Sequence, residues 1–289
     1  MRFGLVGTGH WARTVHGKGL VDHPDTELTG VWGRDPARTA DAAQLLGTKP
    51  YADVDELIAD VDAMAFAVPP GVQAPLAARA AGAGRHLLLD KPLAIERDEA
   101  DAVVRAVEAT GVASAVFFTS LFTPEIRDWL DAVRGQDWDG AFGWWMGNIH
   151  RPGSPYANSP WRDEAGGLWD TGPHALSLLI PLLGPVASVT AVGGRRDTVA
   201  MTTVHEGGGL GSVTMTLSAP EGAGRNGLDL WGPAGRESMP GRAEAGPAMQ
   251  VAIAELLAAA AGSTAQPADA RFAALVTHLL ADAAAQLPA

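Results

Sequence analysis

The amino-acid sequence predicts an α/β domain with a doubly wound parallel sheet, followed by an α+β domain with a mostly antiparallel sheet. Short apolar runs alternate with helical patterns up to about residue 118, whereas later strand patterns follow one another without intervening helices. Alternation of strand and helix is typical of parallel sheets with right-handed crossovers. Consecutive strands favour antiparallel pairing. We therefore expect two domains, residues 1–118 and residues 119–289.

The first domain is predicted from apolar strand runs and from helices with recognisable ends. Pro36 stands at the first position of one expected helix, and Gly111 follows the end of another, as helix termini favour. The expected strands are Phe3–Val6, Leu28–Trp32, Ala63–Val68, His86–Leu89 and Val112–Phe118. The expected helices are Trp11–Val21, Pro36–Leu46, Asp55–Ala59, Val72–Ala83 and Glu96–Thr110.

After about Thr119 the regular alternation of strand and helix patterns ends, and the second domain begins. We expect helices over Pro124–Val133, Met249–Ala261 and Ala270–Leu287, and strands over Phe142–Ile149, Val186–Val192, Val199–His205, Gly211–Ser218 and Leu228–Trp231. The segments His150–Gly167 and Ala219–Gly246 are rich in Gly and Pro and predict irregular structure and loops. We expect the C-terminal helix to pack back on the first domain.

Composition and charge exclude several classes of function. Acidic residues number 33 and basic residues 21, a net charge of -12, which disfavours nucleic acid or an anionic membrane as partner. Cysteine is absent, so disulfides and thiolate chemistry are excluded. Pro181, Gly184 and Pro185 interrupt the longest apolar stretch, Ala175–Val192, and no signal peptide is evident at Met1. We expect a cytoplasmic protein that does not enter a membrane.

A glycine motif after the first strand predicts a dinucleotide site. Gly7-Thr8-Gly9-His10-Trp11-Ala12 matches the pattern G-x-G-x-x-G/A between a strand and a helix. There the first glycine permits a tight turn and the second lets the backbone approach a pyrophosphate. The helix N-terminus then offers unpaired N–H groups to the phosphates.

The end of the second strand favours NADP over NAD. An acidic side chain at this point binds the ribose 2′-hydroxyl of NAD, whereas an arginine accommodates the 2′-phosphate of NADP. Gly33 occupies the acidic position, Arg34 follows it, and Asp35 stands just before Pro36, where it suits a helix N-cap. NAD remains the alternative cofactor, with Arg34 then a solvated loop residue.

Two further motifs carry candidate catalytic residues. Asp90-Lys91-Pro92 lies at the carboxyl end of a buried strand, where ligands of open α/β sheets bind. Lysine is rare in this chain (Lys18, Lys49 and Lys91), which favours a specific role for Lys91 over a surface charge. Asp170 and His174 are four residues apart and share one face of a helix, where a carboxylate can orient an imidazole that exchanges protons. The remaining histidines show no metal-ligand spacing, so no metal is expected.

These motifs together resemble the Gfo/Idh/MocA oxidoreductase family. The similarity rests on the glycine motif, on Asp90-Lys91-Pro92 and on Gly166-Gly167-Leu168-Trp169-Asp170-Thr171-Gly172-Pro173-His174, and it extends to Pro69-Pro70 and Trp161-Arg162. The resemblance implies a Rossmann domain, an open-faced sheet that forms a dimer or tetramer interface, and hydride transfer on sugars or cyclitols. It implies catalytic roles for Lys91, Asp170 and His174, and substrate contacts from these three and from Trp161 and Arg162. The expected cofactor-binding residues are Gly7, Thr8, Gly9, His10, Trp11, Ala12, Gly33, Arg34, Val68, Pro69, Pro70, Gln73, Asp90 and Lys91.

The sequence departs from the family pattern in places, and other functions stay open. The usual glutamate before lysine-proline is Asp90, one methylene shorter, and the arginine often found after the last Rossmann strand is missing from Phe118–Pro124. The second domain is also short for the family. A redox-neutral enzyme of glycosidase or epimerase type that retains its nucleotide, and a non-catalytic nucleotide-sensing regulator, are the alternatives to a dehydrogenase.

Overall fold

The computed structural model describes residues 1–241, 244–263 and 266–288. The chain divides into two compact units, each described below by itself. Unit 1 comprises Met1–Phe122 with Ala245–Leu275, and unit 2 comprises Thr123–Glu244 with the residues from Val276 onward.

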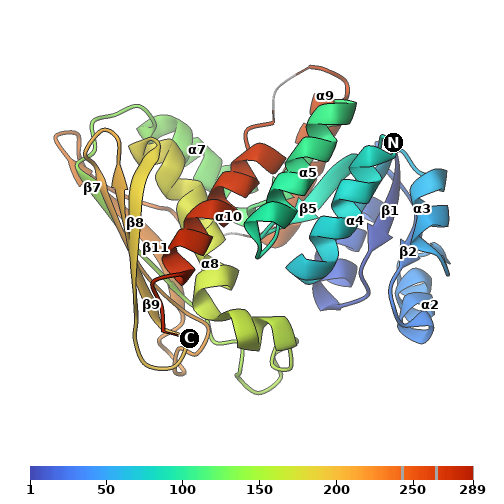
Figure 1. Cartoon of the computed structure of the whole chain (residues 1–289), viewed down its shortest axis with the longest axis horizontal. Helices are drawn as coiled ribbons and strands as arrows, with labels where there is room; N and C mark the ends of the chain where they lie inside the picture. Colours follow the sequence, from blue (N-terminus) through green and yellow to red (C-terminus); the bar gives the residue numbers. More distant parts are fainter. Residues whose placement is uncertain (242–243, 264–265, 289) are drawn as a thin grey trace. The chain divides into compact units, whose positions relative to one another are not determined.

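Unit 1 is built on a six-stranded parallel sheet. Its strands are β1 (Arg2–Val6), β2 (Glu27–Trp32), β3 (Lys49–Pro50), β4 (Ala63–Phe66), β5 (His86–Asp90) and β6 (Ser114–Phe117). They lie in the order β3-β2-β1-β4-β5-β6, so the strand order reverses between β1 and β4. Figure 1 labels β1, β2 and β5 of this sheet. Ligands of such sheets bind beyond the carboxyl ends of the strands at this reversal.

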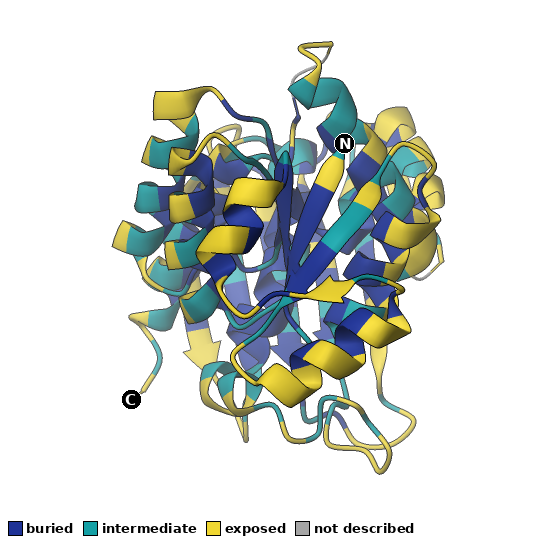
Figure 2. Cartoon of the chain, turned by 90° about the vertical axis from the view of Figure 1, so that its right-hand side faces the viewer, coloured by how far each residue is buried: buried dark blue, intermediate teal, exposed yellow. Residues whose placement is uncertain are grey.

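Helices cover both faces of this sheet. They are η1 (Ala12–Gly17, a π-helix), α1 (Lys18–Asp22), α2 (Pro36–Leu45), α3 (Val54–Asp60), α4 (Pro70–Gly82), α5 (Arg97–Thr110), α6 (Thr119–Phe122) and α9 (Ala245–Ala260). Right-handed connections place η1 and α1 on the face opposite α4 and α5, because the chain runs in opposite directions along the sheet before and after the reversal. In Figure 2 the central strands are buried and the outer faces of the helices are exposed.

Unit 2 is a six-stranded sheet with helices on one face. Its elements are α7 (Pro124–Val133), β7 (Gly140–Met146), α8 (Pro160–Leu183), β8 (Val186–Gly193), β9 (Val199–His205), β10 (Leu210–Thr216), β11 (Arg225–Gly232) and β12 (Gly235–Ser238). α10 (Ala270–Ala284) contributes its residues from Val276 onward. The strand order is β12-β11-β7-β10-β9-β8, antiparallel except for the parallel pair β7–β10.

The two faces of this second sheet differ in their side chains. Val199, Met201, Val213 and Met215 are buried on the face against which α8 packs. The opposite face exposes large apolar side chains, with Phe142 at 50% and Trp231 at 47% of their surface. Trp231 lies over Gly140, where an added Cβ would come within 2.7 Å of the indole.

The mostly antiparallel sheet and the parallel first sheet are confirmed, but two local predictions were wrong, and two further details were not anticipated. α8 begins at Pro160, inside the segment expected to be irregular. β11 and β12 form a hairpin within Ala219–Gly246, which was expected to consist of loops apart from one short strand; residues 242–243 of it lie outside the described residues. β7 and β10 pair in parallel; α8, β8 and β9 lie between them in the chain and supply the long connection that a parallel pair requires. The first helix contains a π-helical segment, η1.

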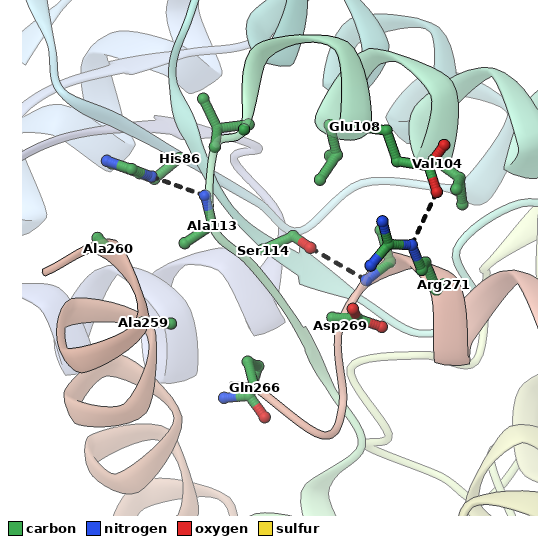
Figure 3. A pocket seen from close by; sticks show the side chains of 14 residues that line it. His86, Val104, Glu108, Ala113, Ser114, Ala259, Ala260, Gln266, Asp269 and Arg271 are labelled. Carbon is green, nitrogen blue, oxygen red and sulfur yellow. Dashed lines mark hydrogen bonds and ion pairs between the residues drawn. The ribbon is translucent and has the colours of Figure 1, made fainter. Parts of the chain in front are cut away.

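A hollow of about 360 Å³ lies at the amino edge of the first sheet. His86 and Ser114, the first residues of β5 and β6, line it (Figure 3), so it is on the edge opposite to the strand ends where ligands of this fold bind. Its polar groups bond to one another: His86 Nδ1 accepts from Ala113 N at 2.9 Å, and Arg271 Nε donates to Glu108 at 2.7 Å. Within the described part of the chain, no helix is long and apolar enough to cross a membrane.

Candidate functional site

The glycine loop follows β1 at the carboxyl edge of the first sheet. Gly7 has φ +135°, and a Cβ there would lie 2.5 Å from the Ala67 carbonyl oxygen and 3.1 Å from Ala12 Cβ. Only glycine fits this position, because a side chain would be strained and would strike the backbone. At Gly9, by contrast, an added Cβ meets nothing within 4 Å. The loop therefore leaves open space over Gly9, as a closely approaching ligand requires.

The residues around these glycines continue into the first helix. Thr8 is half-buried and His10 is exposed. The ring of Trp11 lies 6.4 Å from the ring of Phe117, at the end of β6. The loop thus begins the helix at the carboxyl ends of the strands, where we expect a dinucleotide.

Gly33, at the end of β2, is closely surrounded by two threonine side chains. A Cβ on Gly33 would lie 2.7 Å from Thr8 Cγ2 and 3.1 Å from Thr39 Oγ1. Arg34 follows and is exposed. A carboxylate at residue 33 would need Thr8 to move, whereas the Arg34 side chain extends into solvent.

Asp35, the nearest carboxylate, serves the next helix. Its Oδ1 accepts hydrogen bonds from Ala37 N at 2.9 Å and from Arg38 N at 3.2 Å. It is the N-cap of α2, which satisfies N–H groups that have no partner inside the helix.

Val68 and the two prolines join β4 to α4. Pro69 is extended (φ -53°, ψ 146°), and Pro70 opens the helix. The Pro69 carbonyl accepts from Val72 N at 2.9 Å and from Gln73 N at 3.0 Å. The proline pair therefore fixes where the chain turns over the strand ends.

The side chain of Gln73 forms hydrogen bonds with the backbone of the segment that carries Lys91. Its side chain is buried; Oε1 accepts from Asp90 N at 2.9 Å, and Nε2 donates to Asp90 O at 2.8 Å, Pro92 O at 3.1 Å and Leu93 O at 3.2 Å. Asp90 Oδ1 accepts from Lys91 N at 2.9 Å, and the Lys91–Pro92 peptide is cis. The amide of Gln73 thus holds Lys91 at the carboxyl edge, while its predicted contact with the cofactor stays a prediction.

His16 lies close to Asp90 of this segment and was not singled out in the sequence. The residue is fully buried, neither ring nitrogen has a hydrogen-bond partner among the described residues, and Nε2 is 3.9 Å from Asp90 Oδ2. Burial lowers the pKa of His16 to about 3, so the contact with Asp90 joins a neutral ring to a carboxylate and is not an ion pair at neutral pH. A helical pattern alone does not distinguish this histidine from an ordinary core residue.

In unit 2, Asp170 and His174 lie one turn apart on α8. The helix is kinked at Gly166, where φ is 65° and ψ is -165°. An added Cβ at Gly167 would lie 2.8 Å from Thr216 Cα in β10. The glycine pair therefore lets the backbone turn and pack closely on the sheet. In the helix that follows, Asp170 and His174 are four residues apart and share one face.

Arg162 precedes the kink and contacts Asp170. Its Nε is 3.3 Å from Asp170 Oδ1, and its Nη1 donates to Ser159 Oγ at 3.3 Å. The guanidinium carbon lies 4.6 Å from the centre of the Trp161 ring and 4.7 Å from that of Tyr156. The predicted contact of Arg162 with substrate stays a prediction; within unit 2 its guanidinium is held by a carboxylate, a hydroxyl and two rings.

Asp197 is a second residue that the sequence did not indicate. It accepts hydrogen bonds from Leu217 N at 2.5 Å and Thr216 Oγ1 at 2.7 Å. Burial by itself raises the pKa of Asp197, but these bonds, with one from Ser218, outweigh burial and keep the pKa below its usual value. Asp197 thus holds the end of β10 close to Gly166 through these hydrogen bonds. In the sequence, no motif distinguishes Asp197 from other aspartates in loops.

Both halves of the chain match families of known oxidoreductases. Residues 1–118 match the family described as "Oxidoreductase family, NAD-binding Rossmann fold", and residues 139–236 match the "GFO/IDH/MocA C-terminal domain". These matches define a protein of the family class of NAD-binding Rossmann-fold oxidoreductases. The chain belongs to the Gfo/Idh/MocA family.

Individual relatives act on sugars and cyclitols, according to their names. The chain is 29% identical over 254 residues to dTDP-3,4-didehydro-2,6-dideoxy-alpha-D-glucose 3-reductase of Streptomyces antibioticus, covering 82% of this chain and 74% of the reductase. It is 31% identical over 144 residues to inositol 2-dehydrogenase of Rhizobium meliloti, covering 50% of this chain but only 42% of that enzyme.

The fold also agrees with solved structures. The WlbA dehydrogenase from Bordetella pertussis, in complex with NADH and UDP-GlcNAcA, superimposes with a TM-score of 0.85 at 23% identity. The superposition covers 99% of this chain and 96% of that one, and at this identity it establishes the fold alone.

Proposed function

We propose that the protein transfers a hydride between NADP(H) and a secondary alcohol, or the matching ketone, of a sugar, a cyclitol or a related small polar molecule. The observation that carries this proposal is the carboxyl edge of the first sheet. There Gly9 leaves open space beside the helix N-terminus, and Gln73 holds Lys91 at the end of β5, two strands away from β1 in the same sheet. The relatives named as acting on sugars and inositol support the substrate class.

The preference for NADP(H) over NAD(H) rests on the end of β2. Gly33 carries no carboxylate and Asp35 caps α2, so neither residue is placed to accept from a ribose 2′-hydroxyl. The exposed guanidinium of Arg34 suits a 2′-phosphate instead.

Three side chains would carry the chemistry. His174 takes the hydroxyl proton during oxidation and returns it during reduction, and Asp170 orients the imidazole. Lys91 donates a hydrogen bond to the reacting oxygen and favours its alkoxide character. When bound, the nicotinamide accepts or supplies the hydride. This assignment requires the Lys91 segment of unit 1 and α8 of unit 2 to serve one site.

A substrate panel tests the reaction. Cyclitols, hexoses and nucleotide sugars are incubated with NADP⁺ or NAD⁺, and nucleotide absorbance is followed together with loss of substrate. We expect one class to be oxidised with equal formation of NADPH, and Lys91→Met to lower kcat by roughly 10²–10⁴-fold. Substrate loss without net change in the nucleotide would instead favour the redox-neutral alternative.

Titration tests the choice of nucleotide. A charge-assisted contact with Arg34 is worth about 1.5–3 kcal/mol, or roughly ten- to a hundredfold in affinity. Arg34→Ala should weaken binding of NADPH by this factor and leave NADH nearly unchanged, with the exposed Arg195→Ala as the control. Tighter binding of NADH than NADPH by the unaltered protein would reject the preference.

A further inference from the structure

Arg162 is tied to Asp170 by the shape of α8. The two residues are eight positions apart, which in a straight helix corresponds to about 12 Å along the axis. The kink at Gly166 shortens this path, and Arg162 Nε lies 3.3 Å from Asp170 Oδ1. A glycine with φ 65° is therefore what permits the contact.

The guanidinium is held on more than one side. Its carbon is 4.6 Å from the Trp161 ring and 4.7 Å from the Tyr156 ring, within the range of cation–π attraction. Nη1 donates to Ser159 Oγ at 3.3 Å. Only 18% of the Arg162 side chain and 12% of the Asp170 side chain is exposed. Solvent therefore screens this pair less than a surface ion pair.

We propose that Arg162 is a positioning residue, which keeps the Asp170 carboxylate ionised and directed so that it fixes the tautomer of His174. A buried carboxylate that loses a cationic partner protonates or rotates more readily. Under the proposed function, either change would remove the carboxylate that is assigned to orient the imidazole, although Arg162 itself exchanges no proton. This inference rests on the proposed function, which assigns the Asp170–His174 pair.

Ring nitrogen signals of His174 test the inference in the full-length protein without a substrate. In protein labelled with ¹⁵N-histidine and measured at fixed pH, the chemical shifts of a neutral ring show which of its nitrogens carries the proton. The signal that disappears in His174→Gln is the signal of His174. We expect one tautomer in the unaltered protein and in Arg162→Lys, which keeps the charge. We expect loss of this single-tautomer pattern in Arg162→Met and Arg162→Gln. Arg195→Met is the matched control, because Arg195 is an exposed arginine of the same unit.

Dependence on Asp170 completes the test. Asp170→Asn should also disturb the His174 tautomer, and adding Arg162→Met to it should cause no further change. If Asp170→Asn alters the ring signals but Arg162→Met and Arg162→Gln do not, Arg162 does not act through Asp170 and the inference is overturned. If Asp170→Asn has no effect either, the proposed Asp170–His174 pairing fails. Thermal melting identifies any variant that does not fold. If Arg162→Met does not fold, the result with Arg162→Gln, which retains a donor group, is used to accept or reject the inference.

Discussion

Gly7 and Gly9 share one loop but have opposite surroundings. At Gly7 the Ala67 carbonyl and a φ of +135° exclude any side chain, whereas at Gly9 the space is open. The first glycine therefore serves the fold, and the second serves the ligand that the loop is proposed to bind.

Substitution at each glycine separates these two roles. Gly9→Val should leave the midpoint of thermal unfolding near that of the unaltered protein but weaken nucleotide binding at least tenfold, because the valine fills the space over the loop. Gly7→Ala should lower the free energy of unfolding by about 1–3 kcal/mol through backbone strain. Calorimetric titration and thermal melting give both quantities. Equal nucleotide affinity in the unaltered protein and Gly9→Val would contradict the assignment of the loop.

His16 predicts a pH dependence of stability. Its folded pKa of about 3 lies below the ordinary value of 6.5, so between these values the unfolded chain binds a proton that the folded protein does not. The free energy of unfolding therefore falls as pH is lowered through this range, by up to about 1.4 kcal/mol per pH unit for this group.

His16→Leu should remove that contribution. We expect denaturant unfolding between pH 6.5 and pH 5 to show a shallower loss of stability in the variant than in the unaltered protein. His86 and His205, whose pKa values burial also lowers, continue to contribute in both proteins. Identical pH slopes would show that His16 is protonated equally in the folded and unfolded states.

At the scale of elements, the approach of α8 to β10 depends on Gly167. A Cβ there would lie 2.8 Å from Thr216 Cα, 3.0 Å from Thr216 N and 3.1 Å from Asp197 O, all backbone atoms. Backbone in a sheet cannot yield as a side chain does, so the helix itself would have to move.

Gly167→Ala should therefore destabilise the protein by about 1–3 kcal/mol, the usual cost of overpacking. Gly71→Ala in α4 is the matched control, because its Cβ would meet nothing within 4 Å. A helical glycine replaced without strain is expected to gain about 0.4–1 kcal/mol. Denaturant unfolding measures both, and a neutral Gly167→Ala would contradict the close packing.

Most elements were predictable because their signals are local. α7 and β9 have the bounds expected from the sequence, and Asp35 was recognised as the N-cap of α2. β3 was missed because it contains only Lys49 and Pro50, too few residues for a periodic pattern. The start of α8 was missed because Gly166 and Gly167 resemble a loop signal, although the structure uses them for a kink and a close approach.

The candidate site was predictable only where motifs carry it. The glycine loop and the strand end before Pro92 were recognised from residue types at fixed spacings. The bonds of Gln73 to Asp90, Pro92 and Leu93, and those of Asp197 to β10, join residues far apart in the chain. No single-sequence pattern records such pairings.

At the scale of the whole molecule, the exposed face of the second sheet bears on assembly. Phe142, Trp231, Leu210 and Val192 are each between 44% and 69% exposed, and apolar side chains grouped in this way mark interaction surfaces. We propose that this face joins copies of the chain into a dimer or tetramer.

Charge on this face should dissociate the assembly. Phe142→Glu and Trp231→Glu are expected to give monomers in light scattering coupled to gel filtration, because a carboxylate would be buried without a partner. Val21→Glu is the control, since Val21 is an apolar residue 49% exposed on α1 of unit 1. A monomeric unaltered protein would refute the proposal.

Each unit is built from two separate segments of the chain, and this has a consequence for biosynthesis. Unit 1 needs Ala245–Leu275, which the ribosome delivers only after all of Thr123–Glu244. Until then β6 lacks Ala268, whose carbonyl accepts from Val116 N at 2.7 Å, and α9 has not yet covered β5 and β6. The sheet of unit 1 therefore emerges first but is completed only after Thr123–Glu244 has been made, and a fragment ending at Phe122 would expose the apolar surface that α9 covers.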